Sequence, residues 1–185
     1  DGAVDMASTL TVAGVLTGTS LDISGDIDVD GTTNLDIVDV DGAVNFAADV
    51  TFADGADIIT ASAGTSNFRA GVNAGNSIAS GGNYNVVVGD EAGTALTTGD
   101  YNVALGYLAL PADTLGSRST AIGVAALEAQ NFTSATDTYN TAVGFSAGAA
   151  VTTGVQNTLI GGLAGDAITT GSYNSLVGVN AGGAI

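Results

Sequence analysis

Acidic side chains supply most of the reactive chemistry that this 185-residue chain could offer. It has 17 Asp and two Glu against two Arg, and it contains no Lys, His or Cys, so the net charge is −17. Without an imidazole, a thiol or an amine, an active site would have to be built from carboxylate pairs or hydroxyl groups. The adjacent acids Asp90 and Glu91 follow Gly89 in an expected turn, where exposed charge is ordinary. We therefore predict that the protein is not an enzyme and has no catalytic residues.

One acidic segment, "DIDVDG" at residues 26–31, imitates the beginning of a calcium-binding loop. The twelfth position of that loop requires a bidentate Glu, but the chain has Ile37 there. Ile27 and Val29 alternate with the acids, which is the pattern of a strand with Asp on its solvated face. We predict no metal-ligating or cofactor-binding residues, and keep Ca²⁺ or Mg²⁺ bound by clustered Asp side chains as an open alternative.

The charge balance also limits the partners. Nucleic acids and anionic membrane surfaces bind clustered Lys and Arg, which this chain does not have. The uncharged stretch between Asp137 and Asp166 is interrupted throughout by Asn, Thr and Gly, unlike a transmembrane helix. We predict no nucleic-acid partner and no insertion into a membrane.

The C-terminal two thirds of the chain is an internal repeat. Glycines recur at intervals of 18, 17, 17, 21, 17 and 17 residues. An Ala lies three residues after each of them, and an Asn lies four residues before each of them except in the fourth repeat, where Ser119 takes its place. The four surplus residues of the long interval fall around "NFTSATDT", residues 131–138, and predict a loop extruded from one coil. The repeat positions are Gly71, Gly89, Gly106, Gly123, Gly144, Gly161 and Gly178, with Asn85, Asn102, Asn140, Asn157 and Asn174.

A period of 17 residues with one strand per repeat predicts a parallel β-solenoid, or β-roll, of about seven coils over residues 67–185. In most repeats both residues before the glycine are apolar, so the strand carries apolar groups on its two faces. One face fills the coil, and the other requires a partner. We predict a homotrimer that buries this second face. The Asn column is expected to form turns and amide ladders between coils, with ion or sugar binding as the alternative.

Residues 1–66 have a different pattern. Apolar residues alternate there with Thr, Ser or Asp between glycine turns, and 12 of the 17 Asp lie in this part. Short strands with one apolar face are expected, and no face is wide enough to close a globular core. We predict an Asp-rich, β-structured shaft in which three chains wrap around a common axis.

The units "YNVALGYLAL", "STAIGVAAL", "YNTAVGFSAG" and "YNSLVGVNAG" resemble the head repeats of YadA-like trimeric adhesins and similar repeats in bacteriophage tail fibres. The resemblance covers about residues 67–185, and Ser119–Gly123 is its nearest match. It implies an all-β fibrous homotrimer used for structure and surface recognition. The Asp-rich section "LDISGDIDVDG" resembles the shafts of phage fibres, which favours a virion fibre over a bacterial adhesin.

These patterns together predict a structural fibre protein of a virion, located outside the cell, with other virion or tail proteins as partners. A host glycan or protein would be contacted by the extruded loop, through Asn131, Phe132, Thr133 and Asp137. The first alternative is a trimeric adhesin of the bacterial cell surface or a subunit of an extracellular filament. A remote alternative is ice binding by in-register threonines, which are Thr97, Thr98, Thr152, Thr153, Thr169 and Thr170.

Overall fold

The computed structural model of the protein describes residues 44, 60 and 62–183. The predicted shaft, residues 1–66, lies almost entirely outside the described residues, and its structure and its boundary stay predictions. The described part of the chain is built from strands and turns and contains no helix. The all-β prediction is thereby confirmed for the repeat region.

Nine short strands form this region. Seven have three residues each: β1 (Phe68–Ala70), β2 (Val86–Val88), β3 (Val103–Leu105), β5 (Thr120–Ile122), β7 (Thr141–Val143), β8 (Thr158–Ile160) and β9 (Ser175–Val177). Two have two residues each: β4 (Gly116–Ser117) and β6 (Thr136–Asp137).

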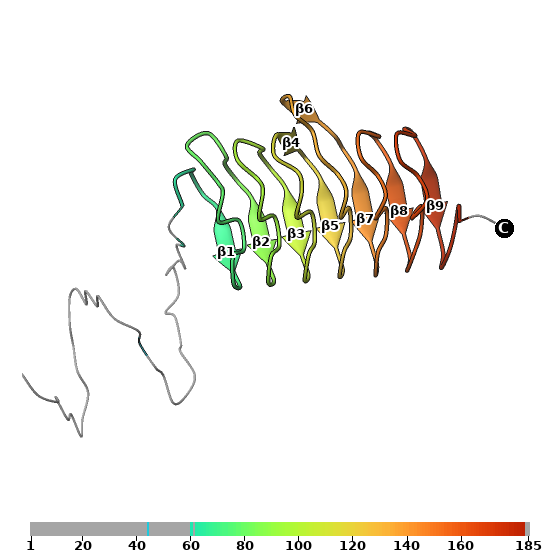
Figure 1. The fold of residues 1–185 in the computed structure, drawn as a ribbon, viewed down its shortest axis with the longest axis horizontal. Helices are drawn as coiled ribbons and strands as arrows, with labels where there is room; N and C mark the ends of the chain where they lie inside the picture. The colour runs from blue at the N-terminus through green and yellow to red at the C-terminus, as the bar shows by residue number, and fades with distance from the viewer. Residues whose placement is uncertain (1–43, 45–59, 61, 184–185) are drawn as a thin grey trace, which may run out of the picture. The chain divides into compact units, whose positions relative to one another are not determined.

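The seven longer strands stack in one parallel sheet in the order β1-β2-β3-β5-β7-β8-β9. Each pairs in register with the next, so that Val103, Thr120 and Thr141 follow one another along the sheet. Figure 1 shows the result, a column of coils with one strand of each coil on the same side. The chain makes about six complete turns between β1 and β9, which confirms the parallel β-solenoid.

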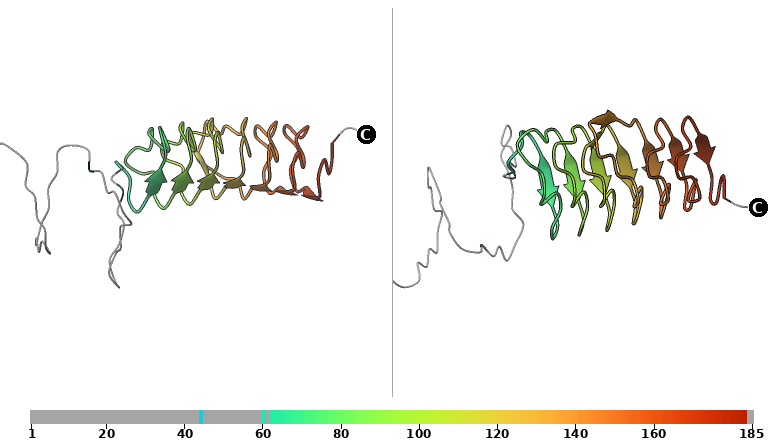
Figure 2. Two further views of the ribbon diagram at one scale, coloured as in Figure 1. Left: turned by 90° about the horizontal axis from the view of Figure 1, so that it is seen from below. Right: turned by 45° about the horizontal axis from the view of Figure 1, so that its top comes forward.

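The extruded loop lies where the sequence placed it. Leu115 bonds to Phe132, 17 residues later, whereas Gly116 pairs with Thr136, 20 residues later. Three of the four additional residues therefore lie between Phe132 and Thr136, and the fourth lies between Asp137 and Thr141, since Thr120 pairs with Thr141, 21 residues later. The returning chain forms β6, which pairs in parallel with β4 in a small second sheet at the upper edge of the coils in Figure 1. Figure 2 shows the coils from two further directions.

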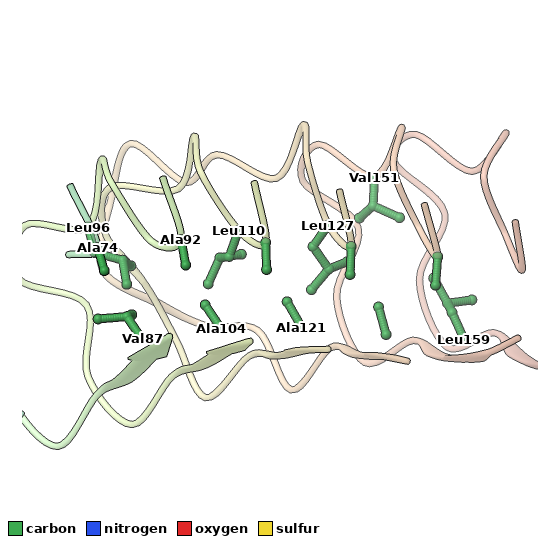
Figure 3. Packing of buried hydrophobic residues seen from close by; sticks show 14 of the residues in the cluster. Ala74, Val87, Ala92, Leu96, Ala104, Leu110, Ala121, Leu127, Val151 and Leu159 are labelled. Carbon is green, nitrogen blue, oxygen red and sulfur yellow. The ribbon is translucent and has the colours of Figure 1, made fainter. Parts of the chain in front are cut away.

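The interior of the solenoid is narrow and is filled by one apolar residue from each side of a coil. In the five strands between the two ends of the large sheet, β2, β3, β5, β7 and β8, the middle residue points inward and is fully buried, as Val87, Ala104 and Leu159 are. The Ala three residues after each glycine faces it from the returning limb (Figure 3). Larger side chains such as Leu96 and Val151 complete the core. Such a core has no second layer, so each coil depends on its neighbours.

The glycine column has a steric origin. These glycines have φ between 125° and 137°, a region that other residues rarely adopt. A Cβ at Gly123 would lie 2.4 Å from the carbonyl oxygen of Gly144 in the next coil. Glycine thus sets how closely successive coils stack.

Candidate interaction surfaces

The outward face of the seven-stranded sheet carries one apolar column along its whole length, beside a second column that is apolar in β1–β3 and Thr or Ser in β5–β9. The first and third residues of each strand point away from the core, and the third is always apolar. Leu105 is 43% exposed and Ile160 is 39% exposed. In five of the seven coils the residue after the glycine adds a further exposed apolar side chain, namely Val72, Tyr107, Val124, Phe145 and Val179, whereas the other two coils have Asp90 and Gly162 there. The predicted division into an interior face and an apolar exterior face is confirmed. We call this exterior face the outer sheet face.

The Asn column is a hydrogen-bond ladder. The Oδ1 of Asn85 accepts the backbone N–H of Asn102 at 2.8 Å, and the Oδ1 of Asn102 accepts that of Ser119 at the same distance. The Nδ2 of Asn102 donates to the carbonyl of Gly116 at 2.9 Å, across the coil. Asn140 and Asn157 repeat both bonds. Every side chain in the column is thus committed to the fold, which supports the ladder reading over ion or sugar binding.

The ladder breaks at Ser119, and a buried polar network replaces it. Ser119 does not accept the backbone N–H of Asn140 as an Asn would; that N–H donates to the hydroxyl of Thr138 at 3.3 Å, and the Thr138 hydroxyl contacts that of Ser119 at 2.6 Å. The Nε2 of Gln130 donates to Ser119 at 2.8 Å and to Oδ2 of Asp113 at 2.6 Å, while its Oε1 accepts from Asn140 at 2.8 Å. All five side chains are fully buried. The network therefore connects the coils on either side of the missing Asn.

Asp113 is the one fully buried acid in the described part of the chain. Its Oδ1 accepts the backbone N–H groups of Gly116 and Phe132, both at 3.0 Å. Burial raises the pKa of the Asp113 carboxyl, and the hydrogen bonds from Gln130, Phe132 and Gly116 oppose this only in part. This carboxylate anchors the beginning of the extruded loop.

We did not predict the buried network of Asp113, Gln130 and Ser119, although the sequence contains a pattern that indicates it. The seventh residue after the glycine is Ile78, Leu96, Val151 or Ile168 in other coils, but Asp113 and Gln130 in the two coils at the break. Polar residues at an otherwise apolar phase, next to the only Ser in the Asn column, predict a buried network.

The loop residues expected at the surface divide into two groups. Asn131, Thr133 and Asp137 are exposed, in agreement with their predicted surface position. Phe132 is only 7% exposed, so its side chain is not on the exposed surface of the loop, and its predicted contact with a partner stays a prediction. Its backbone N–H donates to Oδ1 of Asp113, and its side chain is buried apart from the main apolar cluster of the solenoid.

A column of tyrosines runs along the corner that precedes the strands. We call it the tyrosine column; it comprises one residue from each of six successive coils, namely Tyr84, Tyr101, Arg118, Tyr139, Gln156 and Tyr173, and Ser66 has the equivalent position in the first coil. All six have φ between 51° and 64°, and all are exposed.

Its first members stack on one another. The rings of Tyr84 and Tyr101 lie 5.0 Å apart and within 10° of parallel. The guanidinium of Arg118 lies 4.8 Å from the ring centroid of Tyr101 and 5.9 Å from that of Tyr139, and Asp137 of the loop binds its Nε at 3.0 Å. Arg118 therefore takes the place of a ring in the stack.

The threonines proposed for ice binding are partly engaged in the fold. The hydroxyl of Thr97 donates to the carbonyl of Thr114 at 2.9 Å, and that of Thr152 to the carbonyl of Thr169 at 3.2 Å. These bonds connect successive coils and leave fewer hydroxyls to order water.

Among the residues that the structure describes, no group of three or more His, Cys, Asp or Glu side chains could hold a metal ion. The "DIDVDG" segment lies outside the described residues. No helix capable of crossing a membrane occurs among them.

Comparison with known protein families, with curated proteins and with solved structures finds no match to this chain. The surfaces described above therefore carry the functional argument by themselves.

Proposed function

We propose that the protein is a structural fibre protein of a virion, a phage tail fibre or similar appendage, which forms a rigid homotrimer and displays a host-attachment surface. The observation that carries this proposal is the outer sheet face. Monomeric soluble proteins rarely leave so long an apolar stripe in contact with water. Burial of the stripe between three copies removes it from water and leaves the loop and the tyrosine column available on the remaining surface.

The hydrogen bonds between successive coils make the solenoid suitable for a mechanical role in a fibre. Backbone hydrogen bonds connect every coil to the next, and the Asn ladder adds a second set of bonds inside the column. The high negative charge keeps such fibres soluble and apart from one another. The resemblance to tail-fibre and YadA-like head repeats supports the same assignment.

The oligomeric state is tested by native mass spectrometry of the full chain and of two variants. Ile160→Asp places a charge on the outer sheet face, and Thr153→Asp places the same charge at an exposed corner away from that sheet. We expect trimers for the wild type and for Thr153→Asp, and mostly monomers for Ile160→Asp with an unchanged β-type circular dichroism spectrum. A stable wild-type monomer would contradict the proposal.

The virion assignment is tested separately by labelling. An antibody raised against residues 67–185 is expected to label an appendage of virions and to reduce their adsorption to cells. Labelling of bacterial cells instead, together with an outer-membrane β-barrel encoded in the same reading frame, would favour the adhesin alternative.

A further inference from the structure

At one position of the tyrosine column, Gln156, neither an aromatic ring nor a guanidinium group stands between two tyrosines. We call this position the step at Gln156. We propose that a neutral sugar ring binds at this step, between Tyr139 and Tyr173 and against the side chain of Gln156. The inference rests on the proposed attachment function and names the class of ligand and the residues that would hold it.

The spacing of the column allows a ring to enter there. Tyr84 and Tyr101 lie on adjacent coils, and their rings are separated by 5.0 Å, which is about one rung of a β-sheet. Tyr139 and Tyr173 lie two rungs apart, because the strands that follow them pair in register with β8 between them. Two rungs correspond to about 9.6 Å. One additional ring between these tyrosines would have the separation from each that Tyr84 and Tyr101 have from one another.

The residue at this step differs from the other non-aromatic member of the column. Arg118 covers the faces of the rings beside it and is fixed by Asp137. Gln156 is exposed, and its amide makes no hydrogen bond to any other described residue. The amide therefore has a donor and an acceptor free to bind hydroxyl groups of a ligand.

The tyrosines on either side are accessible. Tyr139 is 53% exposed, and Tyr173 is 75% exposed. Arg118 lies over the ring of Tyr139, and the coil of Gln156 lies on the other side of Tyr139, because β7 pairs with β5 on one side and with β8 on the other. Two aromatic faces and a free amide together match the usual composition of a small-molecule site, in which rings supply contact and a few polar groups supply specificity.

The charge of the chain selects the ligand. A pyranose ring combines an apolar C–H face, which packs on aromatic rings, with a rim of hydroxyl groups that can bond to Gln156 and to the tyrosine hydroxyls. Acidic sugars and nucleobases carried on phosphate are disfavoured by the net charge of −17. A neutral glycan is therefore the ligand class that fits this step.

The test compares the full-length wild type with Gln156→Tyr on an array of neutral oligosaccharides, followed by titration with the best binder. The substitution continues the ring stack and fills the step, so we expect binding to weaken by about tenfold or more. The control is Tyr84→Ala, which changes the same column four coils away and should leave affinity within about twofold. An unchanged circular dichroism spectrum and thermal midpoint show that each variant is folded.

Two results would overturn the inference. One is the absence of wild-type binding to any neutral glycan, and the other is equal binding by the wild type and Gln156→Tyr. Binding of labelled protein to intact host cells separates this inference from the attachment proposal. If both proteins bind cells equally, attachment stands and the site is elsewhere; if the wild type does not bind cells, the attachment function itself fails.

Discussion

Three glycine-to-alanine substitutions separate the two physical reasons for the glycine column. Gly123 and Gly178 have nearly the same backbone conformation, with φ of 126° and 125°. An added Cβ at Gly123 would meet the Gly144 carbonyl oxygen at 2.4 Å, whereas at Gly178 the nearest atom is 4.0 Å away. Gly162 has no atom within 4 Å of an added Cβ and no positive φ. The pair at matched φ isolates the effect of coil stacking.

The expected losses follow from these contacts. Positive φ costs an alanine about 1–2 kcal/mol, and this cost is common to Gly123→Ala and Gly178→Ala. Relief of the contact at Gly123 must move the next coil, which adds about 1–3 kcal/mol for overpacking. It also weakens the bond from Gly144 N–H to the Ile122 carbonyl, now 2.8 Å, at about 1 kcal/mol. We expect a loss of about 3–6 kcal/mol at Gly123, about 1–2 kcal/mol at Gly178, and less than about 0.5 kcal/mol at Gly162.

The assay is unfolding of the full chain by denaturant, followed by circular dichroism at one fixed protein concentration, since self-association would contribute to the midpoint. We expect the denaturant concentration at the midpoint of unfolding to be highest for Gly162→Ala, lower for Gly178→Ala and lowest for Gly123→Ala. Equal midpoints for the Gly123 and Gly178 variants would refute the steric account of coil spacing and leave backbone strain as the only role of these glycines.

Two further predictions concern the buried polar groups. Asn102→Ala leaves the N–H of Ser119 and the carbonyl of Gly116 without their side-chain partners, and is expected to destabilise the protein by about 2–4 kcal/mol in the same assay, against less than about 1 kcal/mol for the control Asn83→Ala on the exposed side. Because burial raises the folded-state pKa of Asp113, its contribution to stability is fully present below its unfolded pKa and is lost as the pH rises through the folded value. The stability of the wild type relative to Asp113→Asn should therefore fall as the pH rises above about 4, the ordinary pKa of an Asp carboxyl, and a difference that does not change with pH would contradict this sign.

The regular part of the fold was predictable because it is repeated. Each coil must satisfy the same steric and hydrogen-bonding requirements, so the same residue types recur at the same positions of every repeat. The glycine spacing, the inward apolar residue and the Asn ladder were therefore visible without an alignment. The position of the extruded loop followed in the same way, since four additional residues in a 17-residue period can lie only where the period is broken.

The corners of the coils could not be predicted from residue type. Tyr101, Leu108 and Ala125 adopt positive φ, which single-residue preferences assign to Gly, Asn or Asp. Stacking of one coil on the next imposes this conformation, and the ring contacts of the tyrosine column offset part of its cost. The cause lies between coils, so no local pattern identifies these positions.

The core around Asp113 shows how the same narrow interior accommodates two chemistries. In the regular coils a large apolar side chain such as Leu96 stands three residues after a glycine, and a Cβ on that glycine, Gly93, would lie 2.9 Å from Cδ1 of Leu96. In the two coils at the break, Leu110 and Leu127 replace this glycine and are fully buried, while Asp113 and Gln130 replace the large apolar residue. The large apolar side chain thus lies three residues earlier in these two coils than in the regular ones. Asp113 and Gln130 occupy the vacated positions, where Gln130 binds both Asp113 and Ser119. A packed interior permits such an exchange only when both positions change together. The polar network and the extruded loop are therefore structurally connected: Asp113 of the network binds the backbone of Phe132 at the start of the loop, and Asp137 at its end holds Arg118 in the tyrosine column.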